Sequence, residues 1–464
     1  MRTAICGGHV VFEDGIVPAT VVIDDRGTIE AVTSPSVDPV VDEVIDASGL
    51  HVFPGVIDPH THLNDPGSTA SEDFYSGTCG AAAGGITTVV EMPQTIPIVI
   101  NRERFLEKLA IARSKAVVDF ALGGALTAEN VCEGGSPDLH EMADEGAIAF
   151  KGFTSESPEQ PRIADNLLAE AMREVTQLGL VVGIHCEDQP LIDYYTAKLL
   201  AEGRNDALVN PDSRPATTEI EAVRRVIALG ELAGARFHIV HVSHPASFDL
   251  IREARSRGVA VTGETCAHYL TFTRDDVARI GSYAMCNPPL RDAEARAALW
   301  TMLARGDIDC IGTDHCAYTE EEKANADFWQ MPAGISGIQV MFPLVVGEAA
   351  RHDVDLPTLA RVFSGQVARA FGLYPKKGAI LPGSDADLVL VNVDDSWTVR
   401  GAELFSKAPG TAYEGLVVRA RVRRTLSRGR TVFIDDGSRR ILVEPGSGEF
   451  VRPSRASRLA VATV

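Results

Sequence analysis

Five metal-binding side chains and one lysine stand at the ends of separate apolar runs in this 464-residue chain, where they could hold metal ions. In chain order the six residues are His60, His62, Lys151, His185, His241 and Asp314. Because side chains alternate along a strand, His60 and His62 face the same side and can grip one cation. Neutral imidazoles and carboxylates bind zinc-like cations, which activate water and polarise carbonyl groups. The pattern therefore predicts a metal-dependent hydrolase.

Lys151 follows the apolar residues Ile148, Ala149 and Phe150, and we predict an unusual role for it. A lysine on an isolated strand usually pairs with an acid or extends its ammonium group to solvent. At the end of a buried strand, however, burial lowers the pKa of a lysine. The neutral amine can then react with carbon dioxide to give a carbamate, whose two oxygens can bridge two cations. We therefore expect a carboxylated Lys151 between two divalent metal ions.

The other candidate side chains divide by their positions along the chain. His185 and His241 would serve the second metal ion. Asp314 ends the last apolar run, and a carboxylate there can take a proton from an activated water and pass it to a leaving nitrogen. His238 points the opposite way on the same run as His241, which is typical of a core histidine. Two further histidines, predicted to lie in a second layer or in loops, are His244 and His268.

From residue 55 the chain alternates between strand-like and helix-like segments, which could bring these distant side chains together. Apolar β-rich runs recur at Val56–Ile57, Thr87–Val90, Val117–Leu122, Ala147–Phe150, Leu180–Ile184, Phe237–Val240, Val259–Thr262 and Ile308–Ile311. Helix-like segments include Glu103–Ser114, Asn166–Leu178, Glu219–Leu232, Phe248–Arg257 and Ala293–Ala304. Alternation of this kind predicts a parallel sheet, and eight units predict a closed (β/α)8 barrel of the TIM type. Such barrels carry their sites at the C-terminal ends of the strands, where the six candidate residues fall.

The two ends of the chain differ from this central region in having short strands and turns. Residues 1–54 and residues 373–464 each contain too few strands for a comfortable domain of their own. We therefore expect them to pair into one β-sandwich that flanks a barrel formed by residues 55–372. The end of the second segment is predicted to be a C-terminal tail.

Composition limits the partners and the location of the protein. The formal net charge of -21 would repel nucleic acid and anionic membranes, while a hydrophobic content of 45% suits a large soluble core. The eight cysteines show no paired short spacing, which favours reduced thiols in the cytosol. The first residues lack the apolar core of a signal peptide, and no apolar stretch is long enough to span a membrane. We expect a cytoplasmic enzyme that acts on a small molecule.

These residues and their neighbours resemble the amidohydrolase superfamily, and within it the cyclic amidohydrolases, namely hydantoinases, allantoinases and dihydroorotases. The segments that carry the resemblance are Pro54–Gly67, Gly84–Thr88, Phe150–Lys151, His185–Glu187, His241–Ser243, Gly263–Thr265, Asn287–Arg291, Gly312–His315 and Gly383–Leu388. The resemblance implies two metal ions, usually zinc, bridged by carboxylated Lys151 and a hydroxide. It implies that His60, His62 and Asp314 hold one ion and that His185 and His241 hold the other. It also implies that Asp314 shuttles a proton while a ring amide opens to a carbamoyl acid, in a homodimer or homotetramer.

The residues around the site favour some rings over others within this group. Dihydroorotases carry an arginine where this chain has Asn64, and Asn64 instead resembles allantoinases. D-hydantoinases and dihydropyrimidinases carry a tyrosine shortly after the lysine, whereas residues 152–157 here contain none. The leading hypothesis is therefore hydrolysis of allantoin or a 5-substituted hydantoin. A dihydroorotase-like activity, or hydrolysis of another cyclic imide or dihydropyrimidine, is the alternative.

Three residues are predicted to contact the substrate: Asn64, Asn287 and Gly334. Gly334 lies in the segment Pro332–Gly337 after the last strand, where backbone groups could bind a ring imide, and Asn287 lies in the loop after the seventh strand. Two other classes of protein remain as hypotheses. A non-catalytic scaffold of the same fold would bind no metal, and a mononuclear deaminase would not need Lys151.

Overall fold

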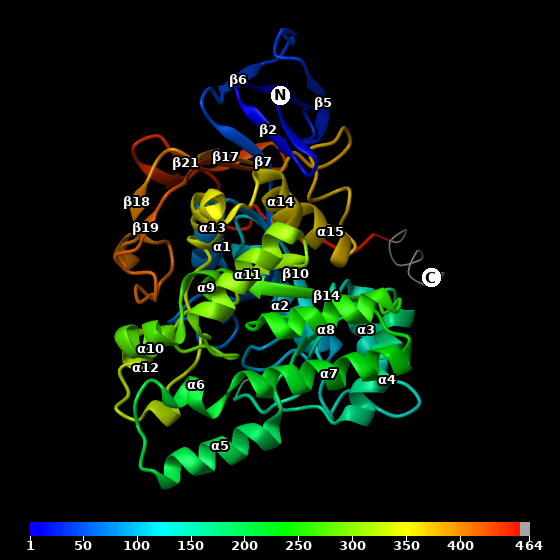
Figure 1. The fold of residues 1–464 in the computed structure, drawn as a ribbon. Helices are drawn as coiled ribbons and strands as arrows, with labels where there is room; N and C mark the ends of the chain where they lie inside the picture. Colours follow the sequence, from blue (N-terminus) through cyan, green and yellow to red (C-terminus); the bar gives the residue numbers. More distant parts are fainter. Residues whose placement is uncertain (159, 455–464) are drawn as a thin grey trace.

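The computed structural model describes residues 1–158 and 160–454, and a barrel of parallel strands forms its centre (Figure 1). The eight barrel strands are β8 (Val56–His62), β9 (Ile86–Glu91), β10 (Asp119–Ala125), β11 (Ala149–Phe153), β12 (Val181–His185), β13 (Phe237–Ile239), β14 (Val261–Cys266) and β15 (Cys310–Gly312). They pair in this order, and each neighbouring pair is parallel. The short strand β16 (His315–Cys316), which follows β15 directly, pairs with β8 and closes the ring. The predicted (β/α)8 barrel is confirmed.

Helices lie between the barrel strands and bury one face against them. They are α1 (Phe74–Ala83), α2 (Arg102–Lys115), α3 (Pro137–Glu145), α4 (Asp165–Gln177), α7 (Ala216–Ala233), α8 (Pro245–Ser256), α11 (Ala293–Arg305) and α13 (Met341–Ala349). In α4, the buried residues Leu168, Ala171, Met172 and Val175 recur every three or four positions, which places them on one face. The five helices predicted from the sequence correspond to α2, α4, α7, α8 and α11.

Further helices, most of them short, lie at the C-terminal face and in the last βα unit of the barrel. They are α5 (Gln189–Ala201), α6 (Val209–Ser213), α9 (Ala267–Thr271), α10 (Arg274–Ile280), α12 (Glu320–Lys323), α14 (Leu356–Ala360), α15 (Gln366–Ala370) and the 3-10 turn η2 (Phe328–Gln330). Figure 1 shows α5 and α6 far from the terminal strands of the chain. No helix in the two described ranges is both long and apolar enough to cross a membrane.

Strands from both ends of the chain form a seven-stranded and a four-stranded sheet beside the barrel, and β18 and β19 form a separate two-stranded sheet (Figure 1). The N-terminal strands are β1 (Thr3–Cys6), β2 (His9–Phe12), β3 (Gly15–Pro18), β4 (Thr20–Ile23), β5 (Ile29–Thr33), β6 (Glu43–Asp46) and β7 (His51–Pro54). The C-terminal strands are β17 (Leu388–Asn392), β18 (Trp397–Thr398), β19 (Val417–Val418), β20 (Arg421–Ser427), β21 (Arg430–Asp435) and β22 (Arg439–Ile441).

The two ends meet in a seven-stranded sheet of order β22-β21-β20-β17-β7-β2-β3, while β5-β4-β1-β6 form a second sheet. Buried side chains from both sheets pack into one core, including Ile5, Val21, Val52, Leu388 and Leu426. The predicted flanking β-sandwich built from both termini is therefore confirmed as an architecture. The division at residues 54/55 and 372/373 remains our prediction, and residues 455–464, at the end of the segment where we predicted a C-terminal tail, lie outside the described residues.

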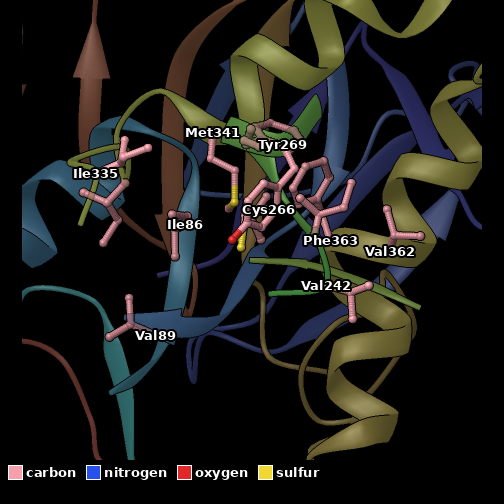
Figure 2. Close-up of a cluster of buried hydrophobic side chains, with 14 of the residues drawn as sticks. Ile86, Val89, Val242, Cys266, Tyr269, Ile335, Met341, Val362 and Phe363 are labelled. Carbon is pink, nitrogen blue, oxygen red and sulfur yellow. The ribbon is translucent and has the colours of Figure 1, made fainter. Parts of the chain in front are cut away.

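The largest apolar cluster lies between the barrel strands and the surrounding helices. Part of it, including Cys266, Tyr269 and Phe363, is shown in Figure 2. Cys266 ends β14 and Tyr269 lies in α9, so this packing anchors the chain where it leaves the seventh barrel strand. A firmly packed strand end fixes the directions of the side chains that project from it.

Candidate metal centre

All six candidate metal-binding residues lie together at the C-terminal ends of the barrel strands. His60 and His62 are on β8, Lys151 is on β11 and His185 ends β12. The other two, His241 and Asp314, lie two residues after the ends of β13 and β15. We call these six residues the strand-end cluster. The (β/α)8 closure explains why side chains more than 250 positions apart in sequence become neighbours.

The contacts within the strand-end cluster define two groups joined through Lys151. The Nε2 atoms of His60 and His62 are 3.3 Å apart, and each is 3.3 Å from Oδ1 of Asp314. In the second group, Nδ1 of His185 is 3.0 Å from Nε2 of His241. The Nζ atom of Lys151 lies 3.2 Å from Nε2 of His60. The three ligand atoms of His60, His62 and Asp314 lie within 4.8 Å of one another, which is close enough for one cation.

Two members of the strand-end cluster have a backbone conformation that sequence patterns do not reveal. His241 has a φ of 38° and Asp314 a φ of 46°, both in the left-handed region. A non-glycine residue held there costs about 1–3 kcal/mol, and such residues gather at functional sites. The backbone at each strand end places the side chain beside other members of the cluster, Asp314 next to His60 and His241 next to His185.

Glu264 on β14 is a functional residue that motif reasoning missed, since its segment entered only as part of the resemblance. Its carboxylate accepts from Nδ1 of His60 at 2.9 Å and from the backbone N–H of His241 at 3.1 Å. Nε2 of His238 is also 3.2 Å from it, so His238 supports Glu264 from within the core. With its Nδ1–H donated to Glu264, His60 presents the lone pair of Nε2 to the cluster. One signal in the sequence could have identified Glu264. Side chains alternate along a strand, and Glu264 falls on the side of its barrel strand that faces inward.

A second carboxylate orients His185 in a similar way. Oε2 of Glu187 is 2.9 Å from Nε2 of His185, and Arg214 forms an ion pair with the same oxygen. Burial raises the pKa of Glu187, but Arg214 and His185 outweigh it and hold that pKa below its ordinary value. Glu187 is therefore anionic and keeps the His185 ring fixed.

Burial favours the neutral form of three imidazoles of the cluster, those of His60, His185 and His241, and the neutral form is the one that binds metal. Burial lowers the pKa of His60 to about 4, with a further contribution from Lys151, and it lowers the pKa of His241 as well. Burial likewise lowers the pKa of Lys151 to about 8, although Asp314 and Glu264 act against it. Burial opposes ionisation of Asp314, but His60, His62 and His241 hold its pKa well below the ordinary value.

These residues fit a bound cation because Lys151 is the only cationic side chain of the cluster, beside the several electron pairs that meet there. The lone pair of His60 Nε2 points at a carboxylate oxygen and at another imidazole nitrogen, contacts that repel unless a cation lies between them. The buried Nδ1 of His241 has no hydrogen-bond partner in the described part of the chain. Nitrogen and oxygen donors in this number and spacing suit zinc.

The three predicted substrate contacts lie in different surroundings. The Asn64 side chain donates to the carbonyl of Ala317 at 3.2 Å, and Asn64 itself has a φ of 57°. Oδ1 of Asn287 accepts from Nδ2 of Asn210 at 2.9 Å. The backbone of Gly334 is engaged within the protein, since its N–H donates to Met285 at 2.8 Å and its carbonyl accepts from Lys323 at 3.1 Å. Contact of these three residues with a substrate stays a prediction.

The chain belongs to the amidohydrolase family, whose sequence pattern it matches over residues 51–432. It is 39% identical over 452 residues to a protein of Solibacter usitatus called allantoinase, with 96% of each chain covered. It is 41% identical over 456 residues to a protein of the same name from Rubrobacter xylanophilus, covering 97% of this chain and 98% of the relative.

Solved structures support the same family. The L-hydantoinase (dihydropyrimidinase) of Arthrobacter aurescens has a TM-score of 0.93 and 33% identity, over 97% of this chain and 99% of that one. The dihydropyrimidinase of Brevibacillus agri NCHU1002 has a TM-score of 0.90 and 30% identity, over 98% and 99% of the two chains. The fold of a cyclic amidohydrolase therefore extends over nearly the whole chain.

Proposed function

We propose that this protein is a binuclear-metal cyclic amidohydrolase that opens allantoin or a 5-substituted hydantoin to the open-chain carbamoyl acid. The observation that carries the proposal is the strand-end cluster, whose imidazoles, carboxylate and buried lysine converge at the C-terminal face of a barrel. The relatives called allantoinase and the hydantoinase structures support this choice of ring.

The proposal assigns two divalent metal ions, most simply zinc, to the strand-end cluster. His60, His62 and Asp314 would hold one ion, His185 and His241 the other, and carboxylated Lys151 would lie between them. Such a pair of ions supplies Lewis acidity for the ring carbonyl and lowers the pKa of water. The depressed pKa of Lys151, about 8, leaves far more neutral amine at physiological pH than an ordinary lysine has. That neutral amine is the form that can take up carbon dioxide.

Asp314 is assigned the proton transfers. Its low pKa keeps it anionic, so it can accept a proton from the attacking water and return it to the ring nitrogen as the C–N bond breaks. The water supplies a hydroxyl group to the carbonyl carbon and a hydrogen to the nitrogen, which balances the hydrolysis. Glu264 and Glu187 keep His60 and His185 in fixed orientations throughout.

A dihydroorotase-like activity, or hydrolysis of another cyclic imide or dihydropyrimidine, is the alternative. The similarity to the structure of a dihydropyrimidinase supports the dihydropyrimidine class of substrate. Asn64 in place of an arginine argues against a substrate carboxylate at that position, because an amide supplies no positive charge.

We further propose a cytoplasmic homodimer or homotetramer. The eight cysteines, all in the described part of the chain, are free thiols, which fits a reducing compartment. Size-exclusion chromatography with light scattering measures the assembly, and a monomer at micromolar concentration would contradict it.

The test of the proposed function is a set of ring-opening assays on the metal-loaded protein, with metal content measured on the same sample. Allantoin, 5-substituted hydantoins, dihydrouracil and dihydroorotate form the panel. We expect turnover of allantoin or a hydantoin, with about two metal ions per chain as a bridged site requires. Turnover of dihydroorotate or dihydrouracil alone would favour the alternative. If the protein binds no metal and turns over none of these substrates, the result would support the hypothesis of a non-catalytic scaffold.

A further inference from the structure

We infer that the cavity beside Asn287 is a subsite for the ureido substituent of allantoin, and that Asn210 recognises this group. The inference rests on the proposed function and deepens it, because it separates allantoin from hydantoins with alkyl or aryl substituents. The cavity measures about 140 Å³, and helices α5 and α6, turn η2 and the segments around Met285–Asn287 and Met331–Ala333 form its walls. A water needs about 10–15 Å³ of such space, so a substituent of four heavy atoms has room.

The cavity adjoins the strand-end cluster through a short chain of contacts. Arg214 lines the cavity and forms an ion pair with Glu187, whose carboxylate binds Nε2 of His185 at 2.9 Å. Asn287, predicted to contact the substrate ring, lines the cavity as well. A ring placed over the metal centre beside Asn287 can therefore extend its substituent into the cavity.

Asn210 supplies the observation that points to a ligand. Its side chain lines the cavity and the residue is only 7% exposed. Its Nδ2 donates to Oδ1 of Asn287 at 2.9 Å, while its buried Oδ1 has no hydrogen-bond partner among residues 1–158 and 160–454. A buried acceptor without a donor is costly, so this oxygen calls for an N–H group from an occupant of the cavity.

The helix that carries Asn210 is held firmly in place. Asp212 on α6 forms ion pairs with Arg204 at 3.3 Å and with Arg274 at 2.6 Å. The hydroxyl of Ser213 donates to the backbone carbonyl of Asn210 at 3.1 Å. Asn210 is therefore preorganised, and little ordering entropy opposes the binding of a ligand there.

A ureido group has the chemistry that this cavity can satisfy. Its N–H groups can donate to Oδ1 of Asn210, and its carbonyl can accept from Arg214, whose guanidinium has five N–H donors. The side chains of Met285, Met331 and Trp329 form an apolar wall for the planar group. An alkyl substituent would instead bury Oδ1 of Asn210 against carbon, which a site built for a hydrogen bond discriminates against.

The experiment compares kcat/KM for allantoin and for 5-methylhydantoin in the metal-loaded protein and in the near-isosteric variant Asn210→Leu. We expect the ratio of the two values to fall by about 10- to 100-fold in the variant. The variant Asn210→Asp keeps an acceptor and should lower the ratio less than Asn210→Leu. Asn166→Leu, at an exposed position on α4, is the matched control and should leave the ratio as in the wild type.

Product binding gives a readout that does not depend on turnover. In calorimetry, allantoate carries two ureido groups, one from the opened ring and one from the substituent, whereas N-carbamoylglycine carries only the one from the opened ring. We expect Asn210→Leu to weaken allantoate binding by about 10- to 100-fold and to weaken N-carbamoylglycine binding much less. Equal losses for both products, or an unchanged substrate ratio, would overturn the subsite while leaving ring opening intact. A wild type that opens neither ring would overturn the proposed function itself, and the subsite with it.

Discussion

Two buried clusters of charged side chains lie at opposite ends of the barrel strands, and they differ in whether they contain their own counter-charge. The lysine-centred cluster lies at the start of β10 and consists of Asp119, Lys377, Asp385 and Asp387. Nζ of Lys377 is 2.5 Å from Asp119, 2.7 Å from Asp387 and 2.9 Å from Asp385. The strand-end cluster, in contrast, brings electron pairs of His60, His62 and Asp314 together with only Lys151 nearby.

The geometry of the ligand atoms alone does not separate the two clusters. In each, three acceptor atoms lie within 4.8 Å of one another and could surround a cation. Burial lowers the pKa of Lys377, but the three carboxylates outweigh burial and raise it well above the ordinary value, so an ammonium ion fills that position. The strand-end cluster is completed only by cations from outside. The comparison shows that a metal site is distinguished by ligand atoms without a counter-charge from the protein, more than by the spacing of those ligand atoms.

The largest expected effect comes from removing the bridge in the strand-end cluster. Lys151→Ala should lower kcat/KM for ring opening on the order of 10⁴-fold, since the two ions lose their shared ligand. Bound metal should fall below the wild-type content in elemental analysis. Added short-chain carboxylic acids should restore part of the activity, because a small carboxylate can occupy the position of the carbamate. Full ring-opening activity in Lys151→Ala would contradict the bridged two-metal site and favour a mononuclear one.

Lys377→Met should break the opposite cluster and affect stability instead of metal content. Asp387 would lose its cation, while Asp119 and Asp385 would keep only their ion pairs with Arg428 and Lys376, which should lower the free energy of unfolding by about 3–5 kcal/mol in urea denaturation. The adjacent Lys376→Met is the matched control, since its side chain is 65% exposed although it also contacts Asp385. Loss of bound metal from Lys377→Met without loss of stability would reverse the assignment of the two clusters.

Lowering the pH should reduce the free energy of unfolding, because His268 must become protonated when the chain unfolds. This residue is buried, and neither ring nitrogen has a hydrogen-bond partner within the described ranges. Burial lowers its pKa to about 4 from an ordinary 6.5, so the unfolded chain binds more protons between these values. Stability is therefore complete above pH 6.5 and is lost as the pH falls towards 4.

The variant His268→Gln has no titrating group at this position, so comparing it with the wild type measures the contribution of His268 to the pH dependence of stability. The loss of unfolding free energy between pH 7 and pH 5 should be smaller by about 2 kcal/mol in the variant than in the wild type. Both proteins are compared in the same metal state, so that protonation of the metal ligands affects them equally. Identical pH profiles would show that His268 does not carry the effect.

The smallest effect concerns the orientation of a single ligand. Glu264→Gln removes the anion that accepts from His60, and zinc affinity should fall by about 10- to 100-fold in competition with a chelator. Glu174→Gln is a suitable control, because Glu174 bonds His140 at 2.8 Å far from the barrel strands' ends. Equal zinc affinity in all three proteins would contradict the role of Glu264.

The alternation of strand-like and helix-like segments in the sequence was enough to predict the barrel and to predict that the six strand-end residues lie close together. Each strand end could be located because an apolar run stopped at a polar residue, as at Ile184 and His185. The joining of the two chain ends in one β-sandwich also followed from two strand sets that were each too small to stand alone, and the structure makes this joint by pairing β7 with β17. Strand limits were less accurate, since β14 extends to Cys266 beyond the predicted Val259–Thr262.

The supporting contacts could not be predicted from the sequence in the same way. The contact between Glu264 and His60 depends on the register of β14 around the ring, which no local pattern encodes. The left-handed backbone at His241 and Asp314 depends on the surrounding structure to hold it. The cavity around Asn210 is built from short helices and turns, whose arrangement depends on tertiary packing rather than on periodicity.

The most direct test of this contrast is X-ray diffraction above and below the zinc absorption edge from crystals of the zinc-loaded protein. We predict two anomalous peaks within the strand-end cluster, one near His60, His62 and Asp314 and one near His185 and His241. Density for a carbamate should extend from Lys151 between the peaks, and the lysine-centred cluster should show no peak. A peak among Asp119, Asp385 and Asp387, or a single ion beside an unmodified Lys151, would contradict the account.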